Sequence, residues 1–269
     1  MKILVCIKQV PETSEVKINP KDNTLIREGI STKINPDDKA GIELALRVKD
    51  INKETEVTVI TMGPRESMKA IKESLAMGVD KGILVTGSEF RGADTYATAL
   101  TLSEAIKKLE YDLVITGRHA IDGETGQVGP EIAENLGIPQ ITHCTEVDIR
   151  DNTVVAKRQF EDRQQIIEAK MPCLITIIGE KVKPRYMTVG GIFDIFQRRD
   201  ANRSKKDRIK TINYEDLEGE LKFGINGSPT EVIKMNKVNV KENNEKLTNL
   251  NHEEAADAIF KKMIERGFI

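Results

Sequence analysis

The sequence predicts an α/β protein whose mainly parallel sheet is covered by helices on both faces. Short apolar runs, typical of buried strands, alternate with stretches of helical spacing through the first half of the chain. Strands and helices that alternate at this cadence form β-α-β units, which build parallel sheets. The pattern changes after Pro139, where strand-like runs follow one another without helices between them.

Each element of the first half has a local signal. Asn35 and Pro36 supply cap chemistry for a helix over residues 37–49. Gly63-Pro64 breaks the chain after a strand over residues 56–62. Apolar runs predict further strands over residues 3–10, 81–86 and 111–116, and helical spacing predicts helices over 66–77, 95–109 and 127–136.

The second half favours antiparallel pairing and then loses its periodicity. Strands are expected over residues 141–149, 153–157 and 166–169, with a buried strand over 172–178 that returns to the main sheet. A small antiparallel hairpin is expected from residues 16–18 and 24–26, which flank a polar turn. Beyond residue 179, only residues 252–266 return to clear helical spacing.

These patterns divide the chain into two expected parts. Residues 1–180 form a nucleotide-binding α/β domain, and residues 181–269 form an extended C-terminal arm. About 90 residues with one clear helix cannot bury a core alone, so the arm is either a floppy extension or packs on a partner chain. We expect the second, because the terminal helix has a usable apolar stripe. The charge run 198–206 is interpreted as a solvated linker.

Composition narrows the classes of function. The 269 residues carry a net charge of −2, which argues against a dedicated nucleic-acid binder. No apolar stretch is long enough to span a membrane, and the N-terminus lacks the features of a signal peptide. Cys6, Cys144 and Cys173 are far apart and flanked by apolar residues, so we expect reduced core thiols in a cytoplasmic protein. The histidines and cysteines show no metal-site spacing.

Residues 117–137, GRHAIDGETGQVGPEIAENLG, are the most informative segment. They follow a buried strand, cross a glycine-rich turn and enter a helix, which is the arrangement that offers backbone N–H groups and a positive dipole end to an anion. The glycine spacing fits neither a Walker A loop nor a G-x-G-x-x-G fingerprint. Taken alone, the segment is either a nucleotide phosphate site or an ordinary strand-to-helix turn.

A longer signature points to one protein family. Residues 156–176, AKRQFEDRQQIIEAKMPCLIT, carry a basic residue, acidic residues, a glutamine and then a proline before a buried strand. In this respect the chain resembles the β subunit of electron transfer flavoproteins, from its first residues to about Gly191. Arg163 departs from that pattern, because the family usually has glycine or an acid there.

The resemblance implies a Rossmann-like fold of the adenine nucleotide α-hydrolase-like kind. It also implies an adenine nucleotide bound by this subunit, which is structural AMP in simple electron carriers and a second FAD in electron-bifurcating members. Simple carriers tend to have consecutive acids after Ala-Ile-Asp, whereas residues 120–130 here read AIDGETGQVGP. Residues 90–98, FRGADTYAT, and 185–193, RYMTVGGIF, also look like the bifurcating group.

The bifurcating reading implies FAD and NAD(H) as cofactors, and a redox subunit that is not active alone. Electrons from NADH go to ferredoxin or flavodoxin, and through an FAD on the α subunit to an acyl-CoA dehydrogenase or a 2-hydroxyacid (lactate) dehydrogenase. Two other readings stay open at this point. One is a non-bifurcating carrier that holds AMP, and the other is a nucleotide-sensing or ATP-hydrolysing α/β domain of similar architecture.

Carried over by position, the resemblance predicts a set of cofactor-binding residues and no catalytic acid or base. Asp94 has an equally good reading as a plain helix N-cap, and residues 189–192, which align with the family's partner-recognition loop, also suit a hinge. The predicted cofactor-binding residues are Cys6, Ile7, Lys8, Asn35, Asp37, Asp38, Met62, Gly92, Asp94, Thr95, Gly117, Arg118, Ala120, Ile121, Asp122, Gly123, Glu124, Thr125, Gly126, Gln127, Val128 and Gly129.

Overall fold

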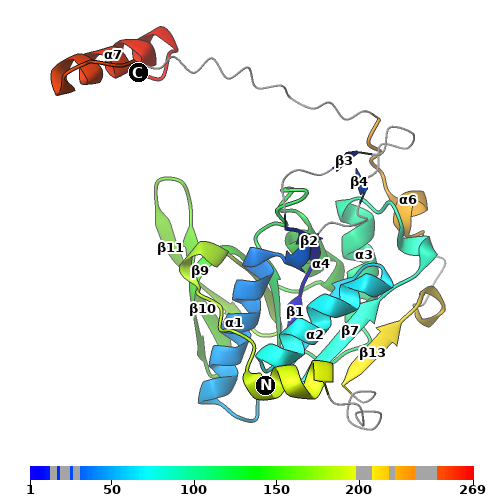
Figure 1. Ribbon diagram of the computed structural model, residues 1–269. Coiled ribbons are helices and arrows are strands. Elements are labelled where there is room, and N and C mark those ends of the chain that lie inside the picture. The colour runs from blue at the N-terminus through cyan, green and yellow to red at the C-terminus, as the bar shows by residue number, and fades with distance from the viewer. Residues whose placement is uncertain (13–16, 19–24, 27–30, 198–207, 218–221, 234–246) are drawn as a thin grey trace. The chain divides into compact units, whose positions relative to one another are not determined.

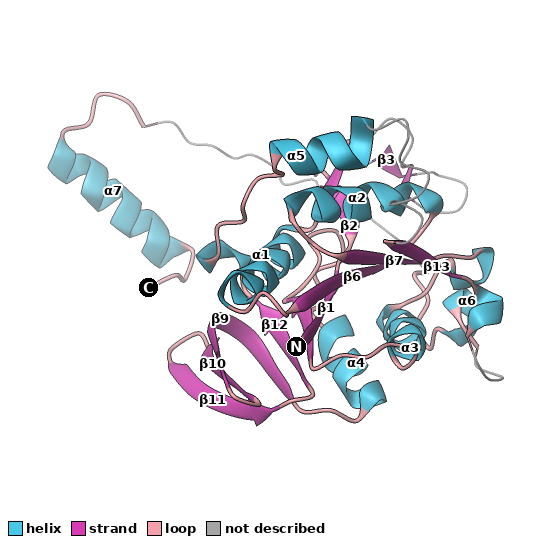
Figure 2. Ribbon diagram, turned by 90° about the horizontal axis from the view of Figure 1, so that it is seen from below, coloured by secondary structure: helices cyan, strands magenta, loops and turns pink. Residues whose placement is uncertain are grey.

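A nine-stranded sheet lies between two layers of helices (Figures 1 and 2). The computed structural model describes residues 1–12, 17–18, 25–26, 31–197, 208–217, 222–233 and 247–269. The strand order is β11-β10-β9-β12-β8-β1-β6-β7-β13. Every neighbouring pair from β9 to β13 is parallel, and β9, β10 and β11 pair antiparallel. The predicted α/β fold with a mainly parallel sheet is therefore confirmed.

The parallel strands are the apolar runs of the sequence. Valine, isoleucine and leucine fill them, and most of their residues are buried because helices cover both faces of the sheet. Their bounds are β1 Lys2–Cys6, β6 Glu56–Met62, β7 Lys81–Val85, β8 Leu113–Gly117 and β12 Cys173–Ile177. The antiparallel end is formed by β9 Gln140–Arg150, β10 Thr153–Gln159 and β11 Gln164–Lys170.

Two separate hydrophobic cores hold the helices on the sheet. One core joins α1 and α2 to one face, and the other joins α3 and α4 to the opposite face, as Figure 2 shows. The helix bounds are α1 Pro36–Ile51, α2 Met68–Met77, α3 Thr95–Ile106 and α4 Val128–Leu136. All four lie where helical spacing predicts them.

The predicted small hairpin is present, and the structure contains a further antiparallel strand pair that the sequence patterns do not predict. β3 Lys17–Ile18 pairs antiparallel with β4 Leu25–Ile26, while residues 16 and 24 of the expected hairpin lie outside the described residues. The first apolar run is divided, because β2 Gln9–Pro11 leaves the main sheet to pair with β5 Thr32–Ile34.

The chain returns to the main sheet after residue 207. β13 Ile209–Ile212 pairs in parallel with β7 and adds an edge strand that the sequence patterns do not predict. Phe90, Tyr214 and Phe223 then pack together, with ring centroids 5.7–6.4 Å apart. Short helical segments elsewhere in the described chain are Arg65–Ser67, Ser88–Phe90, Gly179–Lys181, α5 Val189–Ile192, Phe193–Gln197, Tyr214–Asp216 and α6 Gly224–Gly227.

Contacts divide the chain into two compact units, residues 1–232 and 233–269. The described residues between 181 and 232 therefore belong to the same compact unit as the α/β body. The second unit contains α7 His252–Glu265, whose Asn251 and Glu254 form a capping box. The sequence predicts a different division, at residue 180, with residues 181–269 packing on a partner chain. That division stays a prediction. In the described residues, no helix is both long and apolar enough to cross a membrane.

The three cysteines are buried free thiols, as predicted. Burial raises the pKa of Cys173 to about 11 and that of Cys144 to about 12, and it also raises the pKa of Cys6. All three therefore stay protonated at neutral pH and serve as core side chains.

Candidate functional site

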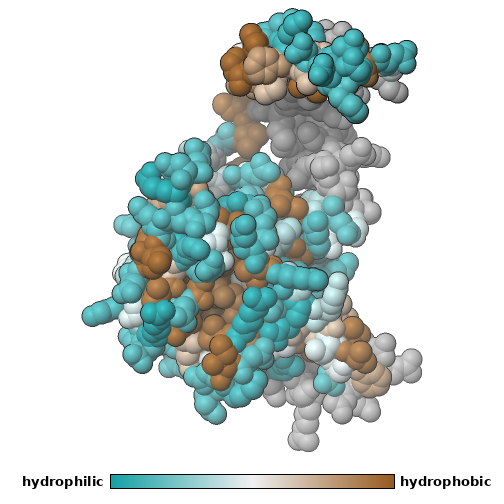
Figure 3. Space-filling view, turned by 90° about the vertical axis from the view of Figure 1, so that its left-hand side faces the viewer, coloured by the Kyte–Doolittle hydropathy of each residue, from teal (hydrophilic) through white to brown (hydrophobic). Residues whose placement is uncertain are grey.

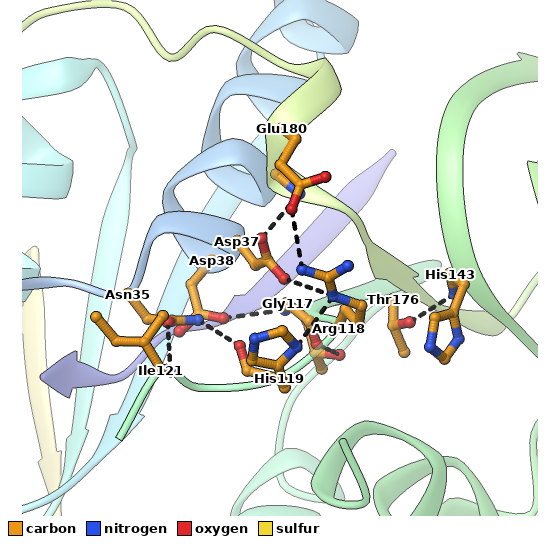
Figure 4. Close-up of polar contacts among 12 residues, drawn as sticks. Asn35, Asp37, Asp38, Gly117, Arg118, His119, Ile121, His143, Thr176 and Glu180 are labelled. Carbon is orange, nitrogen blue, oxygen red and sulfur yellow. Dashed lines mark hydrogen bonds and ion pairs between the residues drawn. The ribbon is translucent and has the colours of Figure 1, made fainter. Parts of the chain in front are cut away.

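The first turn of α1 joins the carboxyl ends of three neighbouring strands. Asp38 is buried, and its two carboxylate oxygens accept hydrogen bonds from the backbone N–H groups of Lys8 (2.7 Å) and Gly117 (3.0 Å) (Figure 4). These residues stand at the ends of β1 and β8. A side chain at Gly117 would collide with Asp38 and Asp37, with its Cβ 2.3 Å from Asp38 Oδ1. Glycine at this position therefore lets β8 end directly against α1.

Asp37 makes the same kind of contact with the next strand. Its Oδ1 accepts a hydrogen bond from the backbone N–H of Gly179, 2.9 Å away, just beyond the end of β12. Its Oδ2 lies 3.3 Å from Nε of Arg118. Arg118 also lies 3.4 Å from Glu180, so protein carboxylates already offset its charge.

Asn35 fixes the loop that follows β8. Its side-chain amide donates to the carbonyl of His119 (2.8 Å) and accepts from the N–H of Ile121 (3.1 Å), while its own N–H donates to the carbonyl of Lys8. Asn35 is completely buried. Asn35 precedes α1 as predicted, but its side chain makes no cap hydrogen bond there and instead holds the glycine-rich loop in place (Figure 4).

The start of α4 is open to an anion. The first N–H groups of a helix have no partner within it, and no side chain caps α4 at Gln127. Gly126 has a left-handed φ of +65°, which favours glycine, and Glu124 adopts φ 51°. A Cβ on Gly129 would lie 2.6 Å from Thr116 Oγ1, so glycine seats the first turn of α4 against β8.

Two polar contacts border this opening. The ammonium of Lys8 lies 2.8 Å from Asp122, so Asp122 is paired within the protein. The hydroxyl of Thr95 lies 3.0 Å from Gln127 Oε1 and 3.2 Å from Glu131 Oε1, which brings the starts of α3 and α4 together. Burial raises the pKa of Glu131, and the nearby charge of Asp94 adds to that rise.

Asp94 acts as a helix cap and a tether. Its Oδ1 accepts from the N–H of Ala97, and its Oδ2 accepts from the N–H and the hydroxyl of Thr230 at 3.0 and 2.7 Å. Gly92 has φ +70°, and its backbone turns close to Ile225. Both carboxylate oxygens of Asp94 thus already have protein partners, which agrees with its reading as an N-cap.

The structure brings most of the predicted site residues to one edge of the sheet. The carboxyl ends of β1 and β8 and the first turns of α1, α3 and α4 carry them, and Met62 ends β6, the strand next to β1. Cys6 and Ile7 are buried in the core, so at most their backbone faces this edge. Ala120, Gly123 and Thr125 belong to the loop that joins β8 to α4.

Three residues of this edge are absent from the sequence-based set. Gly179 directly follows a buried strand, as Gly117 does, and that shared pattern is a signal that identifies it. Glu180 and Glu131 give no comparable signal, because their contacts with Arg118 and Thr95 join positions 62 and 36 residues apart. Such pairs become visible only when the chain is folded.

The donors at this edge fit a phosphate-bearing ligand. Backbone N–H groups at the start of α4 suit phosphate oxygens, and the glycines allow the ligand to approach the backbone closely. Asn35 and Asp38 hold the surrounding loops through buried hydrogen bonds, so the opening is organised before a ligand binds. The arrangement is therefore that of an α/β protein whose sheet edge suits a phosphate-bearing ligand.

Comparison with known proteins places that class in a family. Residues 22–217 match the electron transfer flavoprotein domain. The chain is 43% identical to a caffeyl-CoA reductase-Etf complex subunit of Acetobacterium woodii and 44% identical to an electron transfer flavoprotein subunit beta of Thermoanaerobacterium thermosaccharolyticum, in both cases over the full length of both chains. It is 44% identical to an acryloyl-CoA reductase electron transfer subunit gamma of Anaerotignum propionicum over 87% of each chain. The chain therefore belongs to the electron transfer flavoprotein family, as a β subunit.

Proposed function

We propose that this β subunit serves an electron-bifurcating electron transfer flavoprotein, with FAD bound at the start of α4. In this function NADH is the electron donor. One electron leaves to a low-potential acceptor, ferredoxin or flavodoxin, and the other passes through an FAD on the α subunit to a partner dehydrogenase. The family membership and the phosphate-binding geometry support the nucleotide site, and the loop before α4 supports FAD.

The loop before α4 carries the proposal. After Ala120-Ile121-Asp122, simple carriers tend to have further consecutive acids, whereas this chain continues with Gly123, Glu124 and Thr125. Acids beside a phosphate site repel the ligand, and the pyrophosphate of FAD spreads its charge over two phosphate groups, so it extends further along this loop than the single phosphate of AMP. With Asp122 already paired to Lys8, the loop adds little repulsion to the open start of α4.

The protein's own residues bind and position the ligand. The N–H groups at the start of α4 bind the phosphates, Asn35 and Asp38 fix the loops around them, and Thr95 sets α3 against α4. A flavin held there would supply the redox chemistry, which is hydride acceptance from NADH and release of single electrons. Hydride transfer from NADH to a flavin requires no general acid or base from the protein.

A carrier that holds structural AMP is the alternative. Asp94 is the residue expected to help hold NAD(H), but its two carboxylate oxygens accept hydrogen bonds from Ala97 and Thr230. This placement favours the AMP carrier. In that case the subunit would carry electrons between dehydrogenases without reacting with NADH. The same start of α4 suits the single phosphate of AMP.

The partners follow from the family and from its named relatives. An α subunit completes the heterodimer, and a flavin-dependent acyl-CoA dehydrogenase receives electrons, with a 2-hydroxyacid dehydrogenase as the second possibility. Two of the relatives are named as components of CoA-thioester reductases, which favours the first. Residues 189–192 belong to an exposed apolar segment that suits docking of that enzyme.

Identification of the released nucleotide tests the proposal. The αβ heterodimer is purified, denatured with acid, and its released nucleotides are separated and quantified. We expect two FAD per heterodimer and no AMP. One FAD and one AMP per heterodimer would instead establish the carrier.

A further inference from the structure

An exposed apolar face follows Arg185 in the chain. We call residues 186–197 the docking segment. Tyr186 and Val189 are each 86% exposed, and Phe193 and Phe196 are 56% and 50% exposed. Val189 and Phe193 are four residues apart and lie on one side of the short helical stretch that begins at Val189, and Phe196 follows in its π-helical turn. Large apolar side chains gathered in this way mark a protein-binding surface.

The docking segment is anchored on α2 along its length. The N–H of Thr188 donates to the carbonyl of Ala76 at 3.0 Å, and the Thr188 hydroxyl accepts from the N–H of Gly191. A Cβ on Gly191 would lie 2.4 Å from the Ala76 carbonyl, so glycine allows this close approach. Ile195 is buried in the core shared with α2, and Figure 2 shows α5 beside α2. Contact with α2 thus fixes the inner side of the segment.

The near end is held on α1 by a single arginine. Glu43 Oε2 accepts from both the N–H and Nε of Arg185, at 3.0 and 2.7 Å. Nη2 of Arg185 donates to Glu43 Oε1 at 3.3 Å and to Asp50 at 2.7 Å. The Glu43 side chain is only 6% exposed, and Arg47 donates to its Oε1 at 2.8 Å. The hydrogen bonds to Arg185 hold the pKa of Glu43 below its usual value against the opposing effect of burial.

We call the contacts of Arg185 with Glu43 and Asp50 the clamp. The clamp orients the docking segment more than it stabilises the fold. A buried carboxylate is costly to desolvate, and an apolar pair of the same volume would pack the segment on α1 equally well. The planar guanidinium fork fixes both distance and orientation, which an apolar contact does not. The clamp therefore determines where and at what angle the chain leaves α1, one residue before the exposed Tyr186.

We infer that Arg185 is a positioning residue for partner docking, because its contacts with Glu43 and Asp50 fix the apolar face of the docking segment for a flavin-dependent acyl-CoA dehydrogenase. The inference rests on the proposed function for the identity of the partner. Arg185 acts through the segment and touches neither the nucleotide edge nor the partner. Because α1 also carries Asp37 and Asp38, the test must separate effects on docking from effects on nucleotide binding.

The test compares three variants of the purified heterodimer with the wild type. Arg185→Gln removes the charge and the fork, Arg185→Lys keeps the charge alone, and Arg150→Ala removes an arginine with an exposed ion pair on β9. Steady-state electron transfer to a purified acyl-CoA dehydrogenase gives KM and kcat. Hydrogen exchange reports on residues 186–197, and bound nucleotide is quantified for each variant.

For Arg185→Gln we expect KM for the dehydrogenase to rise about ten-fold, with kcat within about two-fold of the wild type. Exchange in residues 186–197 should accelerate, and nucleotide content should not change. Arg185→Lys should fall between the wild type and Arg185→Gln, because one ammonium cannot replace the fork. Arg150→Ala should match the wild type in all three measurements.

Three results would overturn the inference. An unchanged KM in folded Arg185→Gln would show that docking does not depend on the clamp. A raised KM with unchanged exchange would make Arg185 a contact residue instead. Lost nucleotide with unchanged KM would assign the clamp to the nucleotide edge. Failure of the proposed function is distinct from all three, because it would appear in the wild type itself, as AMP in place of the second FAD when the bound nucleotide is quantified.

Discussion

At the scale of single residues, the site depends on a few buried polar side chains that join distant segments. Asp38 is the central one, since it accepts backbone N–H groups from Lys8 and Gly117 at the ends of two strands. Burial raises the pKa of Asp38 to about 7, although hydrogen bonds from Asn35 and from the two backbone N–H groups oppose the rise. Its charge state therefore changes near neutral pH.

This pKa predicts a pH dependence of stability. An unfolded aspartate ionises near pH 4, whereas the folded Asp38 keeps its proton until about pH 7. The contribution of Asp38 to the free energy of unfolding should therefore fall as pH rises from about 4 to about 7, by on the order of 4 kcal/mol, and then level off. Urea unfolding at pH 5 and pH 7.5 measures the change.

Two variants isolate this contribution from that of other groups. Asp38→Asn cannot ionise, so its stability should depend less on pH than that of the wild type. Asp148→Asn replaces a carboxylate that is 60% exposed on β9, and it should keep the wild-type dependence. Identical pH profiles for the wild type and Asp38→Asn would refute the assigned titration.

Contacts between individual residues are also the feature that the sequence predicts least well. Asn35, Asp37, Asp38 and Gly117 are predicted as site residues by position, through the resemblance to electron transfer flavoproteins, and that resemblance does not predict their contacts. The contacts of Asp37 with Gly179 and of Glu43 with Arg185 each join positions 142 residues apart. No local pattern encodes such pairs, so they follow only from the fold.

At the scale of elements, prediction succeeds where an element has its own periodicity. The parallel strands are continuous apolar runs, and α1 to α4 have helical spacing, so their places follow from sequence. The sequence does not predict β13, because Ile209 and Ile212 are three residues apart and fit no two-residue alternation. Among the described residues, β7 is also its only strand partner. β2 and β5 escape because each has three residues.

The seating of α4 gives a prediction at this scale. In Gly129→Ala the new Cβ would lie 2.6 Å from Thr116 Oγ1 and 3.0 Å from Thr176 Cγ2, so the first turn of α4 must move away from the sheet. We expect nucleotide affinity to fall by about ten-fold, since crowding of a packed site costs about 1–3 kcal/mol. Nucleotide retained after dialysis measures the effect.

Gly190→Ala is the matched control, because a Cβ there has nothing within 4 Å and Gly190 lies on α5. It should retain nucleotide at the wild-type level. If Gly129→Ala also retains nucleotide at that level while remaining folded, the start of α4 is not the phosphate site.

At the scale of the whole molecule, the chain consists of a compact α/β body and a separate terminal unit. No residue of α7 is buried, and Ile259, Phe260 and Ile264 are each more than half exposed. Figure 3 shows brown apolar side chains beside teal polar ones on this helix. An exposed apolar stripe is expected of a helix that packs on a partner subunit.

Limited proteolysis tests that expectation. In the isolated chain, residues 233–269 should be cleaved rapidly, because α7 has no buried residue to protect its backbone. In the αβ heterodimer the same residues should be protected, while the body of residues 1–232 resists in both. Equal cleavage rates with and without the α subunit would show that α7 does not pack on it.

An anaerobic titration of the purified heterodimer with NADH tests the central claim most directly. If this β subunit holds an FAD that reacts with NADH, the absorbance of one of the two flavins should bleach at about one NADH per heterodimer, because hydride transfer needs only that flavin. A heterodimer with one FAD, one AMP and no change in its flavin spectrum on addition of NADH would contradict electron bifurcation.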